Sequence, residues 1–330
     1  MALHKLVLLS LLMRRVPGLL LTRATIARRA SSLAATPQLS SQYEFLDCGN
    51  QRRLERFGEH LVCRNCPSAL WAPGLPLSSW EAATLKHDGS KWTGGATAEG
   101  WRVVMCGDLA FELAPSEQGQ VGIFPEQQEQ WEWIRRVLAG WGDLEAGADS
   151  EQAAVVPRVL NGFAYTGGST MAALSGHRNV NVTHLDASSS AINWASRNVA
   201  AAGWGERPVR FIADDCLTFL RREVKRGKKY EGLIFDPPAF GRGGGSKIWK
   251  LKKDMPSLVD LLSQLLSDRP AFLLLTCHDP DWSAKDLRAL LQSQRLPKGQ
   301  LESGEMSLVP PSGSGGKALP LGCFVRVSFR

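Results

Sequence analysis

The sequence has 330 residues, 44% of them hydrophobic and 22% charged, which is typical of a globular protein with a full hydrophobic core. No apolar run reaches the length that a membrane-spanning helix needs, so we expect neither a transmembrane segment nor a membrane partner. With 39 Lys and Arg against 32 Asp and Glu, the net charge of +7 suits a polyanionic partner such as RNA, and seven cysteines, an odd number, favour reduced thiols over a disulfide scaffold.

The N-terminal segment has a composition of its own. Residues before Glu44 contain no Asp or Glu but several arginines, among them Arg14, Arg15, Arg28 and Arg29. An arginine-rich, serine-bearing and acid-free segment is typical of an organelle transit peptide, whereas a disordered tail is the simpler alternative. We therefore expect residues 1–42 to be a transit peptide for a mitochondrion or a chloroplast.

Residues 43–120 predict a small β-rich domain with long loops. Segments 101–106 and 109–113 flank Gly107-Asp108, which is a hairpin pattern. This region also holds a C-x-x-C pair, Cys63 and Cys66. No second pair of ligands lies nearby in the sequence, so we expect no zinc or other metal site.

Residues 121–330 alternate between strand and helix patterns. Helices are expected over 126–138, 190–202 and 254–266, and strands over 158–163, 181–185, 209–212, 230–235 and 271–276. Two further strands, over 305–308 and 322–328, fit a closing antiparallel pair. This order predicts an α/β fold with a doubly wound, Rossmann-like sheet that is mostly parallel and ends on an antiparallel strand.

The first strand of this region runs into a glycine-bearing turn that indicates a nucleoside site. The turn, 163–168, does not have the G-x-G-x-x-G spacing of a dinucleotide fold and has no phosphate-binding lysine. Asp186 ends the next strand, where a carboxylate can accept both ribose hydroxyls. Asp215 follows the third strand and can accept from an adenine amino group, with Asp214 as the alternative. Either carboxylate could instead cap a helix, but together these positions favour S-adenosylmethionine over a nucleotide.

The fourth strand ends in Asp236-Pro237-Pro238, which indicates the reaction side. Two prolines leave no N–H donors there, so the Asp236 carboxylate and the adjoining carbonyl groups act as acceptors. Phe240 is placed to stack on a planar base, or simply to pack as part of a rigid turn.

Cys277 follows the fifth strand, beside the fourth in this topology. A thiolate there could attack C6 of a pyrimidine and make C5 nucleophilic towards a methyl donor. The alternative is a buried cysteine that serves as a small hydrophobe.

Basic residues gather in two places. The first group, over 221–229, is explained by the solvated end of a helix. The second group follows the Asp-Pro-Pro motif and includes Arg242 and Lys247, with glycines and Trp249 between its members. A basic loop beside the acceptor site favours an RNA substrate.

These motifs resemble the RlmI-like class I S-adenosylmethionine-dependent methyltransferases, which include bacterial enzymes that methylate cytosine C5 in large-subunit ribosomal RNA. The segments that carry the resemblance are 161–168, 186–188, Asp215 and 236–240. Segments 122–127 and 53–58 are similar to a less characterised branch with a non-PUA N-terminal region. The chain differs from the cytosine enzymes at His278-Asp279, where those enzymes have small polar residues.

The resemblance implies a role for individual residues. It implies catalytic roles for Asp236 and Cys277, and contacts to the cofactor from Phe124, Gln127, Asn161, Phe163, Tyr165, Thr166, Gly167, Gly168, Asp186, Ala187, Ser188, Asp215, Asp236 and Pro237. Contacts to the RNA substrate are expected from Pro238, Phe240, Arg242 and Lys247. The domains are then residues 1–42, 43–120 and 121–330, the last being the methyltransferase domain.

The function expected from the sequence is methylation of RNA, ribosomal RNA in particular, at cytosine C5 in an organelle. One alternative is methylation of a base nitrogen or another acceptor, with Cys277 only structural. Another is an assembly factor that binds S-adenosylmethionine or RNA without catalysis.

Overall fold

The structure is a computed structural model that describes residues 42–95, 100–141, 156–242 and 248–329. All of these residues belong to one compact unit, Leu39–Arg330. The expected transit peptide, apart from residue 42, lies outside the described residues. Among the helices of the described part, none is long and apolar enough to cross a membrane.

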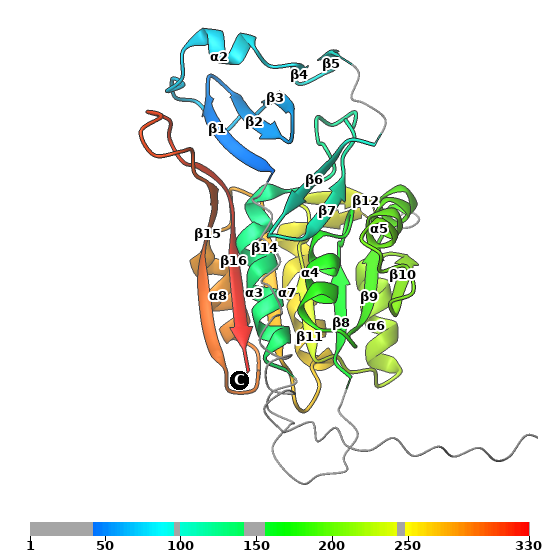
Figure 1. Ribbon diagram of the computed structural model, residues 1–330. Coiled ribbons are helices and arrows are strands. Elements are labelled where there is room, and N and C mark those ends of the chain that lie inside the picture. Colours follow the sequence, from blue (N-terminus) through cyan, green and yellow to red (C-terminus); the bar gives the residue numbers. More distant parts are fainter. Residues whose placement is uncertain (1–41, 96–99, 142–155, 243–247, 330) are drawn as a thin grey trace, which may run out of the picture. The chain divides into compact units, whose positions relative to one another are not determined.

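The segment expected to be β-rich contains a five-stranded sheet and a separate hairpin (Figure 1). The sheet has the order β1-β2-β3-β4-β5, with β1 Tyr43–Gly49, β2 Arg52–Phe57, β3 His60–Asn65, β4 Leu85–His87 and β5 Trp92–Gly94. A short helix, α2 (Leu77–Glu81), lies between β3 and β4. The hairpin pairs β6 (Arg102–Met105) with β7 (Leu109–Glu112), around the Gly107-Asp108 turn that the sequence indicates.

The second sheet confirms the doubly wound α/β fold. Its strand order is β10-β9-β8-β11-β14-β16-β15. The first five are parallel neighbours: β8 Arg158–Gly162, β9 Asn181–Asp186, β10 Val209–Ala213, β11 Gly232–Phe235 and β14 Phe272–Cys277. The last two, β15 (Gln300–Leu308) and β16 (Leu319–Ser328), are antiparallel and close the sheet as predicted.

Helices cover both faces of this sheet, so the parallel strands are buried on both sides (Figure 1). One core cluster contains side chains of α3 (Gln128–Ala139), α4 (Gly168–Gly176) and α5 (Ser189–Ala201). The other contains side chains of α6 (Cys216–Lys225), α7 (Leu251–Leu265) and α8 (Ala284–Gln292).

Two predicted helices have different beginnings in the structure. The helix expected over 126–138 is preceded by a 3-10 turn, η1 (Pro125–Gln127), because Pro125 stands at its first position. Helix α7 begins three residues before the expected 254 because the Asp254 carboxylate accepts the N–H of Lys250, 2.8 Å away, at the helix start.

A two-stranded hairpin that the sequence does not predict follows the Asp-Pro-Pro motif. It consists of β12 (Phe240–Arg242) and β13 (Ile248–Lys250), with Gly241 opposite Trp249. The Trp249 indole N–H donates to the Pro238 carbonyl at 2.6 Å, which ties this hairpin to the motif.

The β6–β7 hairpin and the parallel fold share one hydrophobic core. Phe111 of β7 packs against Trp131 of α3, with ring centroids 5.3 Å apart. The Trp194 indole of α5 donates to the Glu112 carbonyl at 3.0 Å. The expected domain boundary between residues 120 and 121 stays a prediction, and core contacts run across it.

Candidate functional site

A cavity of about 520 Å³ opens at the carboxyl ends of the parallel strands, within the size range of small-molecule sites. Strand β8 lies between β9 and β11, so the strand order reverses at this place, where doubly wound folds bind ligands. The predicted site residues that line the cavity are Phe124, Gln127, Asn161, Phe163, Tyr165, Thr166, Gly168, Asp186, Ala187, Ser188, Asp215, Asp236, Pro237 and Pro238.

The turn after β8 is held in an unusual backbone conformation. Phe163, Tyr165 and Gly167 all have positive φ, at 55°, 49° and 95°. Gly167 caps the start of α4 and is not among the residues lining the cavity. Positive φ is costly for residues other than glycine, so neighbouring groups must hold this turn in place.

The Asp186 carboxylate is the main clamp on this turn. One oxygen accepts the N–H of Tyr165 at 2.9 Å and the other accepts the N–H of Ser188 at 2.8 Å. Burial raises the pKa of Asp186, although these backbone N–H groups oppose the shift. Since a carboxylate has more lone pairs than these two bonds use, Asp186 can still accept from a ligand in the cavity.

The segment before α3 packs against the same turn. The Thr166 hydroxyl donates to the Gly122 carbonyl, and the Phe124 ring lies 5.3 Å from the Tyr165 ring. The Asn161 amide donates to the Thr170 hydroxyl at 3.0 Å, and this hydrogen bond fixes the orientation of the Asn161 side chain. Ile123, Phe124 and Gln127 of this segment line the cavity.

Asp215 and Asp214 have different positions. Asp215 lines the cavity and also caps α6, accepting the N–H of Thr218 at 2.9 Å. Asp214 does not line the cavity, and its side chain pairs with Arg222. Of the two carboxylates between which the sequence leaves a choice, only Asp215 faces the cavity.

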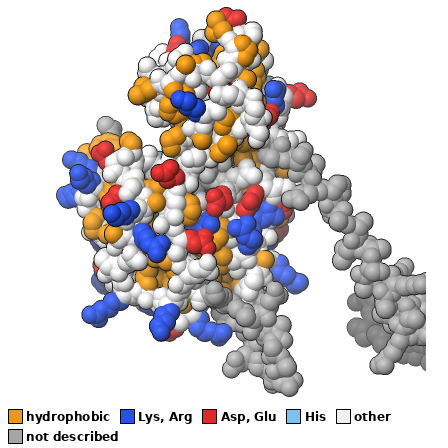
Figure 2. Space-filling view, turned by 90° about the vertical axis from the view of Figure 1, so that its left-hand side faces the viewer, with side chains coloured by type: hydrophobic (Ala, Val, Ile, Leu, Met, Phe, Trp, Pro, Cys, Tyr) orange, Lys and Arg blue, Asp and Glu red, His pale blue; other side chains and the backbone are white. Residues whose placement is uncertain are grey.

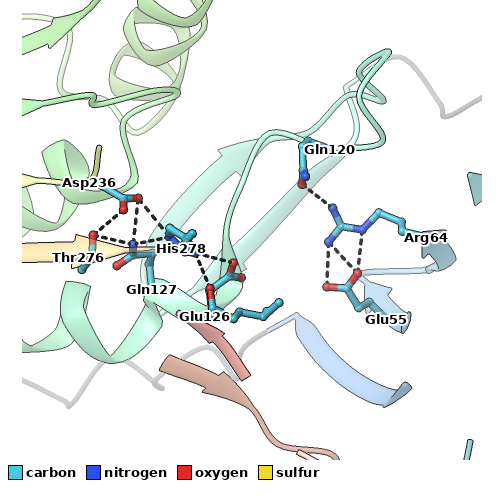
Figure 3. Close-up of polar contacts among 9 residues, drawn as sticks. Glu55, Arg64, Gln120, Glu126, Gln127, Asp236, Thr276 and His278 are labelled. Carbon is cyan, nitrogen blue, oxygen red and sulfur yellow. Dashed lines mark hydrogen bonds and ion pairs between the residues drawn. The ribbon is translucent and has the colours of Figure 1, made fainter. Parts of the chain in front are cut away.

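A dense network of polar side chains surrounds Asp236 (Figure 3). The Thr276 hydroxyl donates to Asp236 Oδ1 at 2.6 Å, and the Gln127 amide donates to Oδ2 at 3.1 Å. His278 Nε2 lies 3.3 Å from Oδ2. His278 also lines the cavity, although the sequence does not mark it as a site residue.

This network shifts the titration of both partners. Burial alone would lower the pKa of His278, but the Asp236 carboxylate, its hydrogen bond and the Glu126 carboxylate raise it from its usual value to about 10. Burial opposes ionisation of Asp236 as well, but the charge and the hydrogen bonds of His278 hold its pKa below the usual value. Both shifts favour the charged forms of the two side chains.

Cys277 lies between two residues of this network but does not line the cavity. Its side chain is fully buried in the core cluster beneath β14, opposite Cys323 of β16. Alternation along the strand explains this, because Thr276 and His278 share one face and Cys277 points to the other. The hydrogen bond with Cys323 lowers the pKa of Cys277, although burial opposes the shift.

The predicted substrate residues are spread around the cavity mouth. Pro238 lines the cavity, whereas Phe240 is 60% exposed on β12. Arg242 ends β12, and Lys247 lies outside the described residues. Gly241 and Trp249, from the opposite face of the hairpin, line the cavity.

Other lining residues were not identified as site residues from the sequence, notably Trp131, Trp249 and His278. Trp131 reads as part of the apolar face of a helix, and nothing in its local pattern separates it from a core residue. His278 follows Thr276 by two residues, so the two side chains lie on the same face of an extended chain. Only this spacing could have indicated His278 as a site residue. No group of His, Cys, Asp or Glu side chains that could hold a metal occurs within the described ranges.

Residues 82–289 match the family model of S-adenosylmethionine-dependent methyltransferases, which covers more than half of the chain. The chain belongs to this family. It is also similar to the crystal structure of a SAM-dependent methyltransferase from Agrobacterium tumefaciens, at 30% identity with a TM-score of 0.78, covering 88% of this chain and 91% of that one. A putative SAM-dependent methyltransferase from Streptococcus mutans, at 13% identity and a TM-score of 0.63, covers 92% of this chain and 79% of its own; it shares the fold.

Curated relatives match shorter segments. The ribosomal RNA large subunit methyltransferase K/L of Methylococcus capsulatus is 46% identical over 82 residues, 24% of this chain and 11% of that protein. The ribosomal RNA large subunit methyltransferase I of Klebsiella pneumoniae is 32% identical over 120 residues, 36% of this chain and 30% of that protein. The matches thus span less than a third of these relatives, and they agree with the RlmI-like resemblance of the motifs.

The protein is therefore an S-adenosylmethionine-dependent methyltransferase, and its cofactor is S-adenosylmethionine. The cavity fits this cofactor in size and charge. Its described charged lining groups are the carboxylates of Asp186, Asp215 and Asp236 and the side chain of His278, without a lysine or arginine. Such a lining suits a cationic sulfonium and disfavours a pyrophosphate.

Proposed function

We propose that this methyltransferase acts on RNA, with ribosomal RNA as the preferred substrate class. Two of the curated relatives are named as large-subunit ribosomal RNA methyltransferases, which supports this substrate class. The residues lining the cavity between Phe124 and Asp215 would hold the cofactor, with Asp186 accepting from the ribose and Asp215 from the adenine.

The surface around the cavity mouth supports an RNA substrate. Phe240 and Ile248, on one face of the β12–β13 hairpin, are 60% and 50% exposed. Lys250, Lys252 and Lys253 follow directly and are exposed as well. An exposed aromatic ring beside several cations offers a base-stacking platform and phosphate contacts at the same place.

A second hollow in the described part is acidic, in contrast to the basic surface beside the β12–β13 hairpin. It is lined by five glutamates, Glu44, Glu126, Glu129, Glu132 and Glu305. Figure 2 looks onto the side of the molecule that carries β15, and acidic side chains gather near the middle of it. Phosphate groups would be repelled there, so we place the RNA at the hairpin side of the cavity.

The acceptor atom that the geometry supports best is a nitrogen. Asp236 is presented to the cavity with both oxygens oriented, while the thiol of Cys277 is directed into the core. The Asp236 carboxylate and a main-chain carbonyl of the Asp-Pro-Pro motif would accept N–H bonds from a base. These bonds would direct the lone pair of the acceptor nitrogen at the methyl group. The bound cofactor supplies an electrophilic methyl group, and the proton that the nitrogen loses would leave by way of Asp236. This orientation of Asp236 is the observation that carries the proposal.

Methylation of cytosine C5 through Cys277 is the second candidate. The lowered pKa of Cys277 and its place at the end of β14, beside the strand that carries Asp236, favour it. This route requires the thiol to turn towards the cavity. Thiolate attack on C6, methyl transfer to C5, loss of the C5 proton and release of the thiol would complete the reaction.

One experiment tests the function and separates the two acceptors. Purified protein is incubated with methyl-labelled S-adenosylmethionine and ribosomal RNA that carries no modifications, and the labelled nucleosides are identified by mass spectrometry. Cys277→Ala should keep most of the activity if a nitrogen is methylated, and lose essentially all of it if C5 is methylated. Cys63→Ala, a change at another buried thiol, controls for a general loss of stability. Absence of any labelled nucleoside in RNA would contradict an RNA substrate.

We further propose that the protein works in a mitochondrion or a chloroplast. The acid-free, arginine-bearing composition of residues 1–42 supports this. A fluorescent fusion of residues 1–42 should be carried into one of these organelles, and a uniform distribution in the cell would contradict the proposal.

A further inference from the structure

Two residues of the 122–127 segment reach from η1 to the reaction side of the cavity. Gln127 donates to Asp236, and Glu126 Oε1 lies 3.8 Å from Nδ1 of His278. Figure 3 shows the His278 ring between the carboxylates of Asp236 and Glu126. The cofactor contacts do not account for Glu126, because its side chain does not line that cavity.

The hydrogen bonds around His278 determine its charge. Nδ1 lies 2.7 Å from the Leu321 carbonyl and Nε2 lies 3.3 Å from a carboxylate oxygen of Asp236. Both neighbours are acceptors, which favours a proton on each ring nitrogen. The Gln127 amide nitrogen lies 3.1 Å from Asp236, 3.2 Å from Nε2 and 3.3 Å from Thr276, and its two protons can be taken by Asp236 and Thr276. With that arrangement, an imidazolium ring leaves every donor in the network with an acceptor.

The Glu126 carboxylate also favours a positive charge on His278. Its side chain is 3% exposed, and its Oε2 has no hydrogen-bond partner among the described residues. A buried carboxylate without a counter-charge is strongly unfavourable. His278 provides that charge on one side, and Arg53 of β2, itself buried, lies within electrostatic range of Glu126.

We propose that His278 is a positioning residue: its imidazolium, held between Glu126 and Asp236, keeps the Asp236 carboxylate ionised and oriented for the methyl acceptor. The role of Asp236 rests on the proposed function, whereas the charge of His278 does not. The 122–127 segment then has a second role, since Glu126 contacts His278 and Gln127 contacts Asp236 from the same turn.

The charge can be measured without a substrate. The full-length protein is labelled with ¹⁵N-histidine, and the His278 ring is titrated by NMR after assignment with His278→Gln. We expect this ring to titrate near pH 10, and Asp236→Asn to bring the transition down towards neutral pH. A transition in the wild-type protein near the ordinary value of ~6.5 would overturn the proposal.

The positioning role has its own readout. His278→Gln should lower kcat about 100-fold while the Kd of S-adenosylmethionine, by calorimetry, changes less than about threefold. Because the cation holds Asp236 ionised, its removal should move the acid limb of the kcat profile upward by ~1 pH unit. His278→Arg, which keeps a cation, should restore part of kcat and the position of that limb.

Controls keep the outcomes distinct. His177→Gln, in the turn between α4 and β9, should change neither kcat nor the profile. If His278→Gln does not fold, Glu126→Gln replaces it: loss of this carboxylate should lower the pH at which His278 titrates. A loss of kcat without any movement of the pH profile would overturn the positioning role. If the wild-type protein methylates no RNA, the proposed function fails, but the NMR titration still decides the charge of His278.

Discussion

At the ends of β8, β9 and β10 the cavity wall is held by hydrogen bonds from backbone N–H groups to the Asp186 carboxylate, whereas at the ends of β11 and β14 it is held by contacts between side chains. On the first side, a turn with positive φ at Phe163, Tyr165 and Gly167 is clamped by backbone hydrogen bonds to Asp186. On the second side, Asp236 and His278 are held by a network of side-chain contacts. The difference matches the two tasks, because a fixed cofactor needs a rigid cradle and a reacting group needs a controlled charge.

The pKa values of the carboxylates on the two sides are shifted in opposite directions. Burial raises the pKa of Asp186, whereas the cation beside Asp236 lowers its pKa despite burial. The Asp186 contacts described above are with backbone N–H groups, so neutralising Asp186 does not remove the partner of a charged side chain. Neutralising Asp236 leaves His278 with Glu126 as its nearest carboxylate, and we expect the lost charge to slow the reaction step.

The largest expected effect is that of Asp236→Asn. The change keeps the shape of the side chain but removes the charge and one acceptor, so kcat should fall about 1000-fold. The Kd of S-adenosylmethionine should change less than about tenfold, because the cradle on the other side is intact. Single-turnover methyl transfer and calorimetry measure the two quantities. An equal loss in both would mean that the two sides of the cavity do not have separate tasks.

Asp186→Asn should show the converse pattern with a smaller effect. Hydrogen bonds to a charged group contribute about 1.5–3 kcal/mol, so the Kd of S-adenosylmethionine should rise about 10- to 100-fold. At saturating cofactor, kcat should stay within about threefold of wild type. Asp214→Asn is the matched control, because this neighbouring carboxylate pairs with Arg222 and does not line the cavity. Equal effects of the two changes would contradict a cofactor role for Asp186.

Much of the cofactor side could be predicted because local rules determine it. Strands that alternate with helices imply a parallel sheet, and the residues that follow parallel strands meet at one edge. On that basis the sequence predicts Asp186 and Asp215 at strand ends, and both line the cavity. The choice between Asp214 and Asp215 required the structure, since a one-residue shift at a strand end reverses the direction of a side chain.

The reaction side was harder to predict for a physical reason. All six residues of β14, Phe272–Cys277, are buried because helices cover both faces of the sheet. Such a strand shows no alternation of polar and apolar residues, so the sequence does not reveal which face Thr276, Cys277 and His278 share. The β12–β13 hairpin was missed because each strand has three residues. The contact of Glu126 with His278 depends on two elements that are far apart in the sequence.

Phe240→Ala should have a moderate effect confined to the substrate. The ring is 60% exposed, so its removal should not lower the thermal stability. Loss of stacking on a base should raise the KM for RNA about tenfold, with the Kd of S-adenosylmethionine unchanged. Leu70→Ala is the control, since Leu70 is 75% exposed but is part of the loop after β3. An unchanged KM would mean that the hairpin is not part of the RNA-binding surface. The site would then consist of the two sides of the cavity alone.

The smallest expected effect separates the two basic groups of the sequence. Lys250 begins the run beside the hairpin, whereas Lys228 follows α6, where Arg222 and Arg226 are already paired with Asp214 and Glu223. If Lys250 contacts a phosphate, Lys250→Ala should weaken RNA binding a few-fold at physiological salt and reduce the slope of log K against log salt by about 1. Lys228→Ala should leave the slope as it is in the wild type. Fluorescence anisotropy with a labelled RNA at several salt concentrations measures both slopes. A larger change from Lys228→Ala would move the RNA path to α6 and away from Asp236, so the reaction side of the cavity would no longer be the side that the substrate enters.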